Sequence, residues 1–243
     1  MTRKASPNTI GILISGRGSN MLAILDRIDA GDLDATAAVV ISDEPGAPGI
    51  LAAHQRGVEA LVLDHRDSRT RGEHDLRLAE ALEARGVRVA CLAGYMRLLS
   101  PWFVERFRGR ILNIHPSLLP AFPGLEAPKQ ALEHGVKVTG CTVHFVDEGV
   151  DSGPIVLQEA VPVHDGDTPE TLAARILAKE HRAYSRAIAL VLSGRLRVEG
   201  RRVVGAAPRP GGRPLPRRQR PVKRPRTPSV GGRRRRRAAA RAR

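Results

Sequence analysis

The first 93 residues alternate regularly between short apolar runs and amphipathic helical patterns, and this alternation constrains the fold more than any other feature. The apolar runs predict strands at 9–15, 36–42, 58–63 and 87–93, and the helical patterns begin near residue 21 and span 47–56 and 71–85. Strands that are apolar on both faces, with a helix between each pair, are typical of parallel sheets covered by helices on both sides.

From residue 110 onward the β-runs become longer. We predict a strand at 110–114, a helix near 126–134, strands at 138–147 and 154–163, a helix from Thr168-Pro169 to about residue 192, and a hairpin at 195–205. Thr is favoured as an N-cap and Pro at the first helical position. Glu199-Gly200 supplies the hairpin turn. The fold class we expect is α/β, with an open, mostly parallel twisted sheet and helices on both faces.

The charge of the chain is unevenly distributed. Residues 205–243 carry 15 Arg and Lys and no acidic residue, whereas residues 1–204 carry 25 basic and 25 acidic residues. The net charge of +15 therefore describes the tail and not the ligand of the folded part. A segment rich in Arg, Pro and Gly has little to bury. We predict a folded domain over 1–205 and a disordered tail over 206–243, which either contacts nucleic acid non-specifically or is passive.

The two cysteines, Cys91 and Cys141, lie inside apolar runs. Buried thiols of this kind indicate a reducing compartment and no disulfide framework. The N-terminus lacks the apolar core of a signal peptide, and no segment has the length of a membrane-spanning helix. We therefore expect a soluble cytoplasmic protein without membrane contact.

Residues 111–120 hold the most informative polar pair. Asn113 and His115 are two positions apart in a predicted strand that stops at Pro116, so both side chains project from one face. An amide can stabilise a developing oxyanion, and an imidazole can move a proton near neutral pH. The pair suits attack on a carbonyl carbon. The alternative is a strand end with a capping Asn and a surface His.

The loop Gly16-Arg17-Gly18-Ser19-Asn20 joins the first strand to the first helix. Glycines allow close backbone approach, and a helix N-terminus offers unpaired N–H groups to an anion, so a bound phosphate is the favoured interpretation. The spacing matches neither a dinucleotide fingerprint nor a P-loop. The alternative is a tight turn with Ser19 as the N-cap.

Two further segments carry weaker signals. Met96 to Leu99 follow the fourth strand at the ligand-binding end of the sheet, where they line an apolar pocket or simply pack before a helix that starts at Ser100-Pro101. Asp151 lies in a polar, Gly-punctuated loop, and from these residues alone we favour a surface turn over a partner for a distant base. His144 is interpreted as a structural residue or as one that supports the site indirectly. No metal-ligand spacing is evident.

Together these segments resemble phosphoribosylglycinamide formyltransferase, a folate-dependent enzyme of purine biosynthesis. The resemblance covers residues 9–204 and rests on Ser-Gly-x-Gly-Ser-Asn, Ala-Gly-Tyr-Met-Arg-Leu-Leu, Asn-Ile-His-Pro-Ser-Leu-Leu-Pro and Asp-Ser-Gly-Pro. It implies a Rossmann-like formyltransferase fold, 10-formyltetrahydrofolate as cosubstrate, no metal, and a monomer or homodimer. It also implies phosphate binding in the N-terminal half and folate binding in the C-terminal half.

The resemblance also implies roles for single residues. The implied catalytic residues are Asn113, His115 and Asp151, with Asp151 raising the pKa of the histidine. The implied substrate-binding residues are Gly18, Ser19, Asn20 and Glu180. The implied folate-binding residues are Arg69, Met96, Arg97, Leu98, Leu99 and Asn113. One segment, 125–129, departs from the family pattern, and we interpret it as loop variation that alters affinity without loss of function.

Three other functions remain open at this point. Formyltetrahydrofolate deformylase resembles the same core but carries an N-terminal regulatory domain, for which a strand beginning by residue 10 leaves no room. Methionyl-tRNA formyltransferase adds a folded C-terminal domain and usually has Arg-Gly where this chain has Phe122-Pro123-Gly124. A nucleic-acid-binding protein acting through residues 206–243 is the alternative from a different class.

Overall fold

A computed structural model describes residues 8–205 of the chain. The strands are β1 (Thr9–Ile14), β2 (Thr36–Ser42), β3 (Ala60–Val62), β4 (Val89–Leu92), β5 (Ile111–His115), β6 (Val138–Phe145), β7 (Ile155–Pro162), β8 (Arg197–Glu199) and β9 (Arg202–Val204). The helices are α1 (Ser19–Asp29), α2 (Pro48–Gln55), α3 (Arg71–Glu83), α4 (Pro101–Arg106), α5 (Ala127–Glu133) and α6 (Pro169–Leu192), with a 3-10 turn η1 (His65–Asp67). The predicted tail at 206–243 lies outside the described residues.

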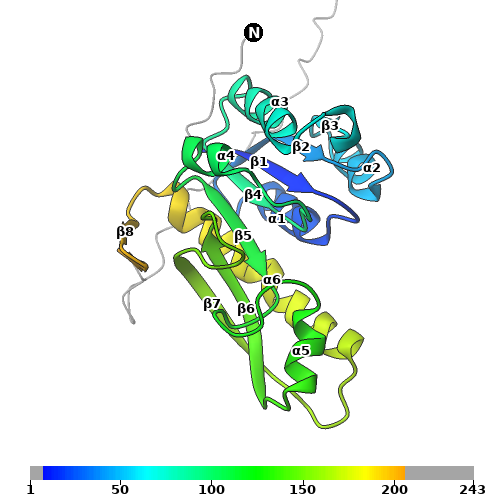
Figure 1. The fold of residues 1–243 in the computed structure, drawn as a ribbon, viewed down its shortest axis with the longest axis vertical. Coiled ribbons are helices and arrows are strands. Elements are labelled where there is room, and N and C mark those ends of the chain that lie inside the picture. The colour runs from blue at the N-terminus through cyan, green and yellow to red at the C-terminus, as the bar shows by residue number, and fades with distance from the viewer. Residues whose placement is uncertain (1–7, 206–243) are drawn as a thin grey trace, which may run out of the picture. The chain divides into compact units, whose positions relative to one another are not determined.

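The strands form one sheet in the order β3-β2-β1-β4-β5-β6-β7-β9-β8 (Figure 1). Strands β3, β2, β1, β4 and β5 are parallel to one another, whereas β6 is antiparallel to both β5 and β7. The short hairpin β8–β9 joins the sheet where β9 pairs with β7. The predicted open, mostly parallel sheet is confirmed.

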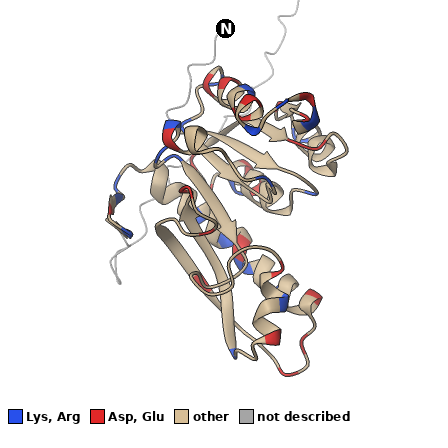
Figure 2. Cartoon of the chain, in the orientation of Figure 1, with Lys and Arg blue, Asp and Glu red and all other residues tan. Residues whose placement is uncertain are grey.

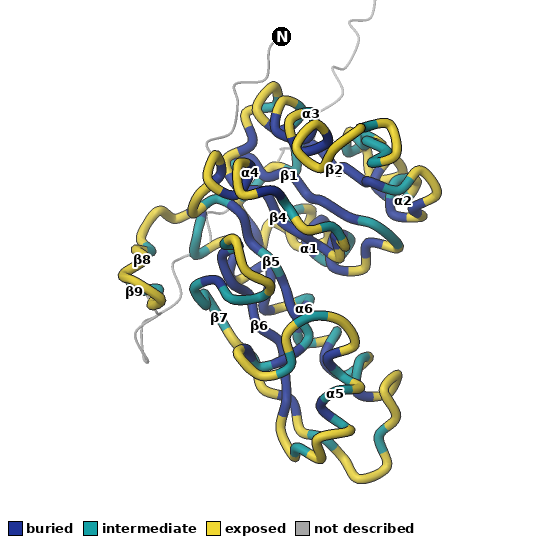
Figure 3. Tube along the Cα trace, viewed as in Figure 1, coloured by how far each residue is buried: buried dark blue, intermediate teal, exposed yellow. Residues whose placement is uncertain are grey.

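Helices cover both faces of this sheet. One core cluster joins α1, α2, α5 and α6 to strand residues such as Ile12 and Val40, and the other joins α3 and α4 to Leu13 and Ile41. Neighbouring strand residues thus point into different clusters, as the two-residue period of a strand requires. The central strands are buried along most of their length (Figure 3), and charged residues lie mainly on helices and loops (Figure 2).

The strand order reverses between β1 and β4, so the loops that follow these two strands leave the sheet side by side. The Ser15 amide donates a hydrogen bond to the Gly94 carbonyl (3.0 Å), and the Met96 amide donates to the Ser15 hydroxyl (2.9 Å). Ligands of open α/β sheets bind in the crevice at such a reversal. Two of the segments identified in the sequence are therefore adjacent in space.

Several local predictions are confirmed. Thr168 is the N-cap of α6, and its side chain accepts a hydrogen bond from the Thr171 amide while Thr171 bonds back. Ser100 caps α4, and Pro lies in the first turn of both helices. The hairpin turns between Glu199 and Arg202.

Three details differ from the sequence predictions. The N-cap of α1 is Gly18, at φ 72°, and not Ser19, because the left-handed conformation that closes the turn suits glycine. Strand β3 is only three residues long, since it lies at the edge of the sheet and pairs with β2 alone. The 3-10 turn η1 had no counterpart among the predicted elements.

Cys91 and Cys141 are both buried free thiols, as predicted. Within residues 8–205, we find no helix that is both long enough and apolar enough to cross a membrane.

Candidate active site

Strand β5 presents Asn113 and His115 at the middle of the sheet, next to the antiparallel strand β6. His144 on β6 is the cross-strand neighbour of Asn113, and the Asn113 Nδ2 atom lies 3.2 Å from His144 Nε2. His115 and His144 are both buried, whereas Asn113 is partly exposed. The amide is therefore the member of this group that solvent reaches most easily.

Asp151 completes the group from the loop between β6 and β7. Its Oδ2 atom lies 3.2 Å from His115 Nδ1, and its Oδ1 atom accepts a hydrogen bond from Asn113 Nδ2 (3.4 Å) and lies 3.6 Å from His144 Nε2. The surface-turn interpretation of Asp151 is wrong. A loop that follows β6 returns to the sheet beside β5, and this long-range contact leaves no local sequence signal.

The charge of His115 is set by opposing effects. Burial lowers the pKa of the imidazole below its ordinary 6.5 and outweighs the Phe122 carbonyl and the Asp151 carboxylate, which both act to raise it. We expected Asp151 to raise the pKa of His115 above its usual value, but the net shift of this pKa is downward. The carboxylate acts in the expected direction, but the low-dielectric surroundings dominate.

Both nitrogens of His115 face acceptors. Nδ1 faces the Asp151 carboxylate, and Nε2 lies 2.8 Å from the Phe122 carbonyl oxygen. Only an imidazolium donates to both acceptors at once. Burial disfavours that charge, so the two hydrogen-bonding partners and the low-dielectric surroundings act on the ring in opposite directions.

Asp151 itself remains ionised. Burial acts to raise the pKa of this carboxyl, but hydrogen bonds involving His144 and the Gly124 amide, and the charge of His115, outweigh it and lower the pKa below 3.8. The Gly124 amide donates to Asp151 Oδ2 over 2.8 Å. A carboxylate that accepts a backbone N–H is stabilised in its charged form.

His144 is the residue whose place in the site the sequence revealed least. Its Nδ1 atom lies 2.8 Å from the Phe145 carbonyl, and its Nε2 atom faces both Asn113 Nδ2 and Asp151 Oδ1. His144 thus orients the Asn113 amide. The alternating strand pattern around it was visible, but the register that pairs it with Asn113 was not.

The Gly16–Asn20 loop and α6 contribute a second group. Asn20 Nδ2 donates to Glu180 Oε2 over 2.7 Å, and both residues are buried. Burial raises the pKa of Glu180 and the Asn20 hydrogen bond partly offsets this. Within the part of the chain that the structure describes, Asn20 Oδ1 is buried without a hydrogen-bond partner. Gly18 and Ser19 lie directly before these side chains at the N-terminus of α1.

Hydrogen bonds hold the backbone of the 95–100 segment, while two of its large apolar side chains are exposed. The Ser15 hydroxyl donates to Asp43 Oδ1 (2.6 Å), and the Ser100 amide donates to Asp75 Oδ2 (2.5 Å). Met96 is 68% exposed and Leu98 58% exposed. Such exposure of large apolar side chains beside polar groups is typical of a binding surface.

The remaining predicted contacts are Arg97, Leu99 and Arg69. Arg97 and Leu99 are half-buried within the same segment as Met96. Arg69 lies in the turn before α3, where it is exposed and its amide donates to Glu73 Oε2 (2.8 Å). The structure brings Arg97 and Leu99 to the ligand-binding end of the sheet. Among the described hydrogen bonds and ion pairs, none joins Arg69 to Asn113, His115 or Asp151.

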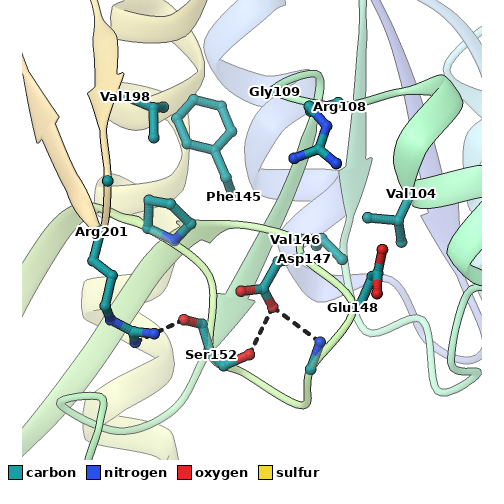
Figure 4. Close-up of a pocket in the computed structure, with 13 residues that line it drawn as sticks. Val104, Arg108, Gly109, Phe145, Val146, Asp147, Glu148, Ser152, Val198 and Arg201 are labelled. Carbon is teal, nitrogen blue, oxygen red and sulfur yellow. Dashed lines mark hydrogen bonds between the residues drawn. The ribbon is translucent and has the colours of Figure 1, made fainter.

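A cavity of about 640 Å³ borders the Asp151 loop on the side of the β8–β9 hairpin (Figure 4). Asp147 accepts hydrogen bonds from the Ser152 hydroxyl (2.6 Å) and the Gly149 amide (3.1 Å), and Arg201 donates to the Ser152 carbonyl (2.9 Å). The carboxylate of Asp147 therefore shapes the loop and is not simply solvated.

Among residues 8–205, one cluster has ligand atoms spaced for a metal ion: Asp43, Glu44 and His65, whose ligating atoms lie within 4.8 Å of one another. Its carboxylates already have partners, since Ser15 donates to Asp43 and Arg66 pairs with Glu44 at 3.2 Å. These hydrogen bonds and ion pairs explain why the three side chains lie close together.

The fold and the site together define a class of protein. A family model described as formyl transferase matches residues 8–188, and the chain belongs to this family. The crystal structure of glycinamide ribonucleotide transformylase 1 from Symbiobacterium toebii is 56% identical, with a TM-score of 0.81, and the match covers 85% of this chain and 98% of that one.

Within the family, the chain is a member of the phosphoribosylglycinamide formyltransferases. The Escherichia coli phosphoribosylglycinamide formyltransferase is 41% identical over 189 residues, which cover 78% of this chain and 89% of that protein. The trifunctional purine biosynthetic protein adenosine-3 of Drosophila melanogaster is 49% identical over 187 residues, 76% of this chain but only 14% of that protein. The chain thus spans about a seventh of this longer relative.

Proposed function

We propose that this protein transfers a formyl group from 10-formyltetrahydrofolate to the amine of 5'-phosphoribosylglycinamide, in purine biosynthesis. The observation that carries the proposal is the convergence of Asn113, His115 and Asp151 at the ligand-binding end of the sheet. The similarity to the Escherichia coli and Symbiobacterium toebii enzymes, over 89% and 98% of those chains, supports the proposal.

In the proposed reaction the amine nitrogen forms a bond to the formyl carbon, and the bond from that carbon to the folate nitrogen breaks. The amine loses a proton and the folate nitrogen gains one. Negative charge develops on the formyl oxygen, where Asn113 and His115 stabilise it.

His115 also moves protons, because an imidazole can donate and accept them near neutral pH. Asp151 holds the Nδ1 side of the ring and supports the transient imidazolium. His144 orients the Asn113 amide through Nε2. None of these steps needs a metal ion.

The two substrates are assigned to different loops. The phosphate is proposed to bind at Gly18, Ser19 and Asn20, where the N-terminus of α1 supplies unpaired N–H groups. Glu180, held by Asn20, is proposed to bind the same substrate.

The folate is proposed to lie along the exposed apolar segment that follows β4, beside Asn113. The proposed contacts are Met96, Arg97, Leu98, Leu99 and Arg69. The phosphate loop thus belongs to the N-terminal half, and the Asn113 and Asp151 side of the folate site to the C-terminal half. We place the reaction in the cytoplasm, where free thiols such as Cys91 and Cys141 persist.

A competition assay tests this proposal. Purified protein, as the full chain and truncated after residue 205, is given the formyl donor with glycinamide ribonucleotide, water or methionyl-tRNA as acceptor. We expect formyl transfer to glycinamide ribonucleotide in both forms. Preferential release of formate, or formylation of tRNA, would overturn the proposal in favour of the two rival formyl enzymes. A salt-sensitive nucleic-acid affinity that disappears on truncation would assign that contact to residues 206–243.

A further inference from the structure

The loop that follows β5 folds back and contacts both members of the His115–Asp151 pair. Its Phe122 carbonyl lies 2.8 Å from His115 Nε2, and its Gly124 amide donates to Asp151 Oδ2 over 2.8 Å. Phe122 has a φ of 55°, in the left-handed region that side chains other than glycine rarely adopt. Such a conformation persists only when surrounding contacts hold it.

Two side chains from the antiparallel strands supply those contacts. The Thr142 hydroxyl on β6 donates to the Ser117 carbonyl (2.7 Å) and accepts from the Leu119 amide (3.0 Å). Gln158 on β7 donates from Nε2 to the Leu119 carbonyl (2.9 Å) and to Thr142 Oγ1 (3.0 Å). Three of these hydrogen bonds hold the first part of the loop by its backbone, and the fourth joins Gln158 to Thr142.

We propose that Thr142 and Gln158 are positioning residues for the His115–Asp151 pair. They fix the loop of residues 117–124, and this loop in turn contacts both His115 and Asp151. Among the described hydrogen bonds, none joins Thr142 or Gln158 to a side chain of the pair, although Thr142 is the cross-strand neighbour of His115. The kinetic part of this inference rests on the proposed function, whereas its structural part does not.

The bonds in question are not those of the sheet itself. Thr142 and Gln158 are cross-strand neighbours whose strands pair through the backbone along the whole of β6. Their side-chain polar atoms point instead to the loop and to each other. Removing these atoms therefore leaves the ladder between β6 and β7 intact and acts on the loop.

The chain offers a matched control on the same strand. Thr139 on β6 is buried like Thr142, but among the described residues its hydroxyl has no hydrogen-bond partner. Thr139→Val and Thr142→Val make the same chemical change at equal burial. Gln158 is exposed, so Gln158→Leu does not open the core, and Gln55→Leu at the exposed end of α2 is its control.

Steady-state kinetics on the full chain is the first test. We expect Thr142→Val and Gln158→Leu to lower kcat about tenfold, as a displaced catalytic pair does, with an unchanged KM for glycinamide ribonucleotide. Thr142→Ser, which keeps the hydroxyl, should restore kcat. Thr139→Val and Gln55→Leu should match the parent. Equal kcat in parent, Thr142→Val and Gln158→Leu, or a loss in Thr139→Val as large as in Thr142→Val, would overturn the proposal.

The second test does not depend on activity. His115 is faced by the Phe122 carbonyl and Asp151, which raise its pKa, and by His144, which lowers it. A displaced loop removes the carbonyl contact and changes the burial that dominates this pKa, so the pKa of His115 should change in Thr142→Val and Gln158→Leu and not in the controls. NMR titration measures it, with the resonance among the eight histidines assigned by its absence in His115→Asn.

The two tests separate the two ideas. If the parent transfers no formyl group but the His115 pKa changes in both variants, the proposed function fails and the positioning role stands. If the His115 pKa is the same in parent, Thr142→Val and Gln158→Leu, the positioning role is wrong whatever the activity of the enzyme.

Discussion

The carboxylate of Asp151 lies 3.2 Å from Nδ1 of His115, so a loop between two antiparallel strands meets the end of a parallel strand at a hydrogen-bonding distance. The pair is almost fully enclosed, with side-chain exposures of 12% for Asp151 and 5% for His115. In such surroundings an ionic contact is screened little by water or salt. The His115–Asp151 contact is therefore where we expect substitutions to act most strongly.

The first prediction concerns Asp151→Asn, which keeps the shape of the side chain and removes its charge. Without the carboxylate the imidazolium of His115 loses its partner, and kcat should fall by about a hundredfold. Stopped-flow or steady-state formyl-transfer rates measure the loss. Asp165→Asn, at an exposed residue that pairs with Lys137, is the control and should keep the parent rate. Near-parent turnover in Asp151→Asn would contradict the assigned role.

The second prediction is acid destabilisation through the buried histidines. Burial lowers the pKa of His74, His115 and His181 below 6.5, so the unfolded chain binds more protons than the native protein below about pH 6.5. The stability that these neutral rings contribute is fully present above that pH and is lost as the pH falls toward their folded pKa values. Tm should decrease from pH 7.5 to pH 5.

The pH dependence has its own control. His181→Gln, at a half-buried position on α6 whose buried Nε2 atom has no partner among the described residues, should make the decrease in Tm smaller. His164→Gln, at an exposed position, should leave it unchanged. A Tm that is constant between pH 7.5 and pH 5 would show that burial of these rings does not control stability.

The third prediction is that Glu180→Gln separates stability from binding. Burial raises the pKa of Glu180, so the native state binds its proton more tightly than the unfolded chain, and the ionised carboxylate destabilises the fold as the pH rises above its unfolded value of 4.5. The neutral amide still accepts the Asn20 hydrogen bond. Tm at pH 8 should therefore rise, while KM for glycinamide ribonucleotide should increase about tenfold from a lost charged contact.

A differential scanning measurement and a substrate titration on the same preparation check both parts. A lower Tm at pH 8 would show that the carboxylate of Glu180 is needed by the fold itself. An unchanged KM would remove Glu180 from the substrate site.

The fourth prediction uses two glycines with the same backbone conformation. Gly18 has a φ of 72° at the start of α1, and Gly57 has a φ of 68° just after α2. Replacement by Ala costs about 1 kcal/mol at each because the left-handed conformation disfavours a side chain. Gly18→Ala should in addition raise KM for glycinamide ribonucleotide, since the new Cβ lies at the N-terminus of α1 and only 3.0 Å from Met21 Cε. Gly57→Ala, with open space around it, should not.

Chemical denaturation and KM measurements on both variants decide this point. If Gly18→Ala and Gly57→Ala lose the same stability and keep the same KM, the loop at Gly18 does not bind the phosphate.

The secondary structure was predictable because its signals are local. The apolar runs at 36–42 and 87–93 became β2 and β4, and Thr168-Pro169 began α6, since period, caps and propensity act over a few residues. The alternative in which Ser19 caps α1 is not observed: Gly18 is the N-cap, because the backbone at that turn is left-handed.

The candidate site was predictable only in part. Asn113 and His115 share a face of β5 by their spacing alone. His144 and Asp151 join them through the register of β6 and the path of the following loop, which no local pattern encodes. Residues taken separately therefore suggested a turn for Asp151 and either a structural or an indirect supporting role for His144.

The sequence by itself determined the mostly parallel α/β sheet, the caps of α4 and α6, the buried thiols and the pair on β5, because each depends on neighbours in the chain. Only the tertiary structure decided which residues face that pair and how they titrate. The Phe122 carbonyl at His115, the Asn20–Glu180 hydrogen bond and the lowered pKa of His115 all arise from segments far apart in the chain. Burial and charge proximity are properties of the packed structure, and they are absent until the loops close over the sheet.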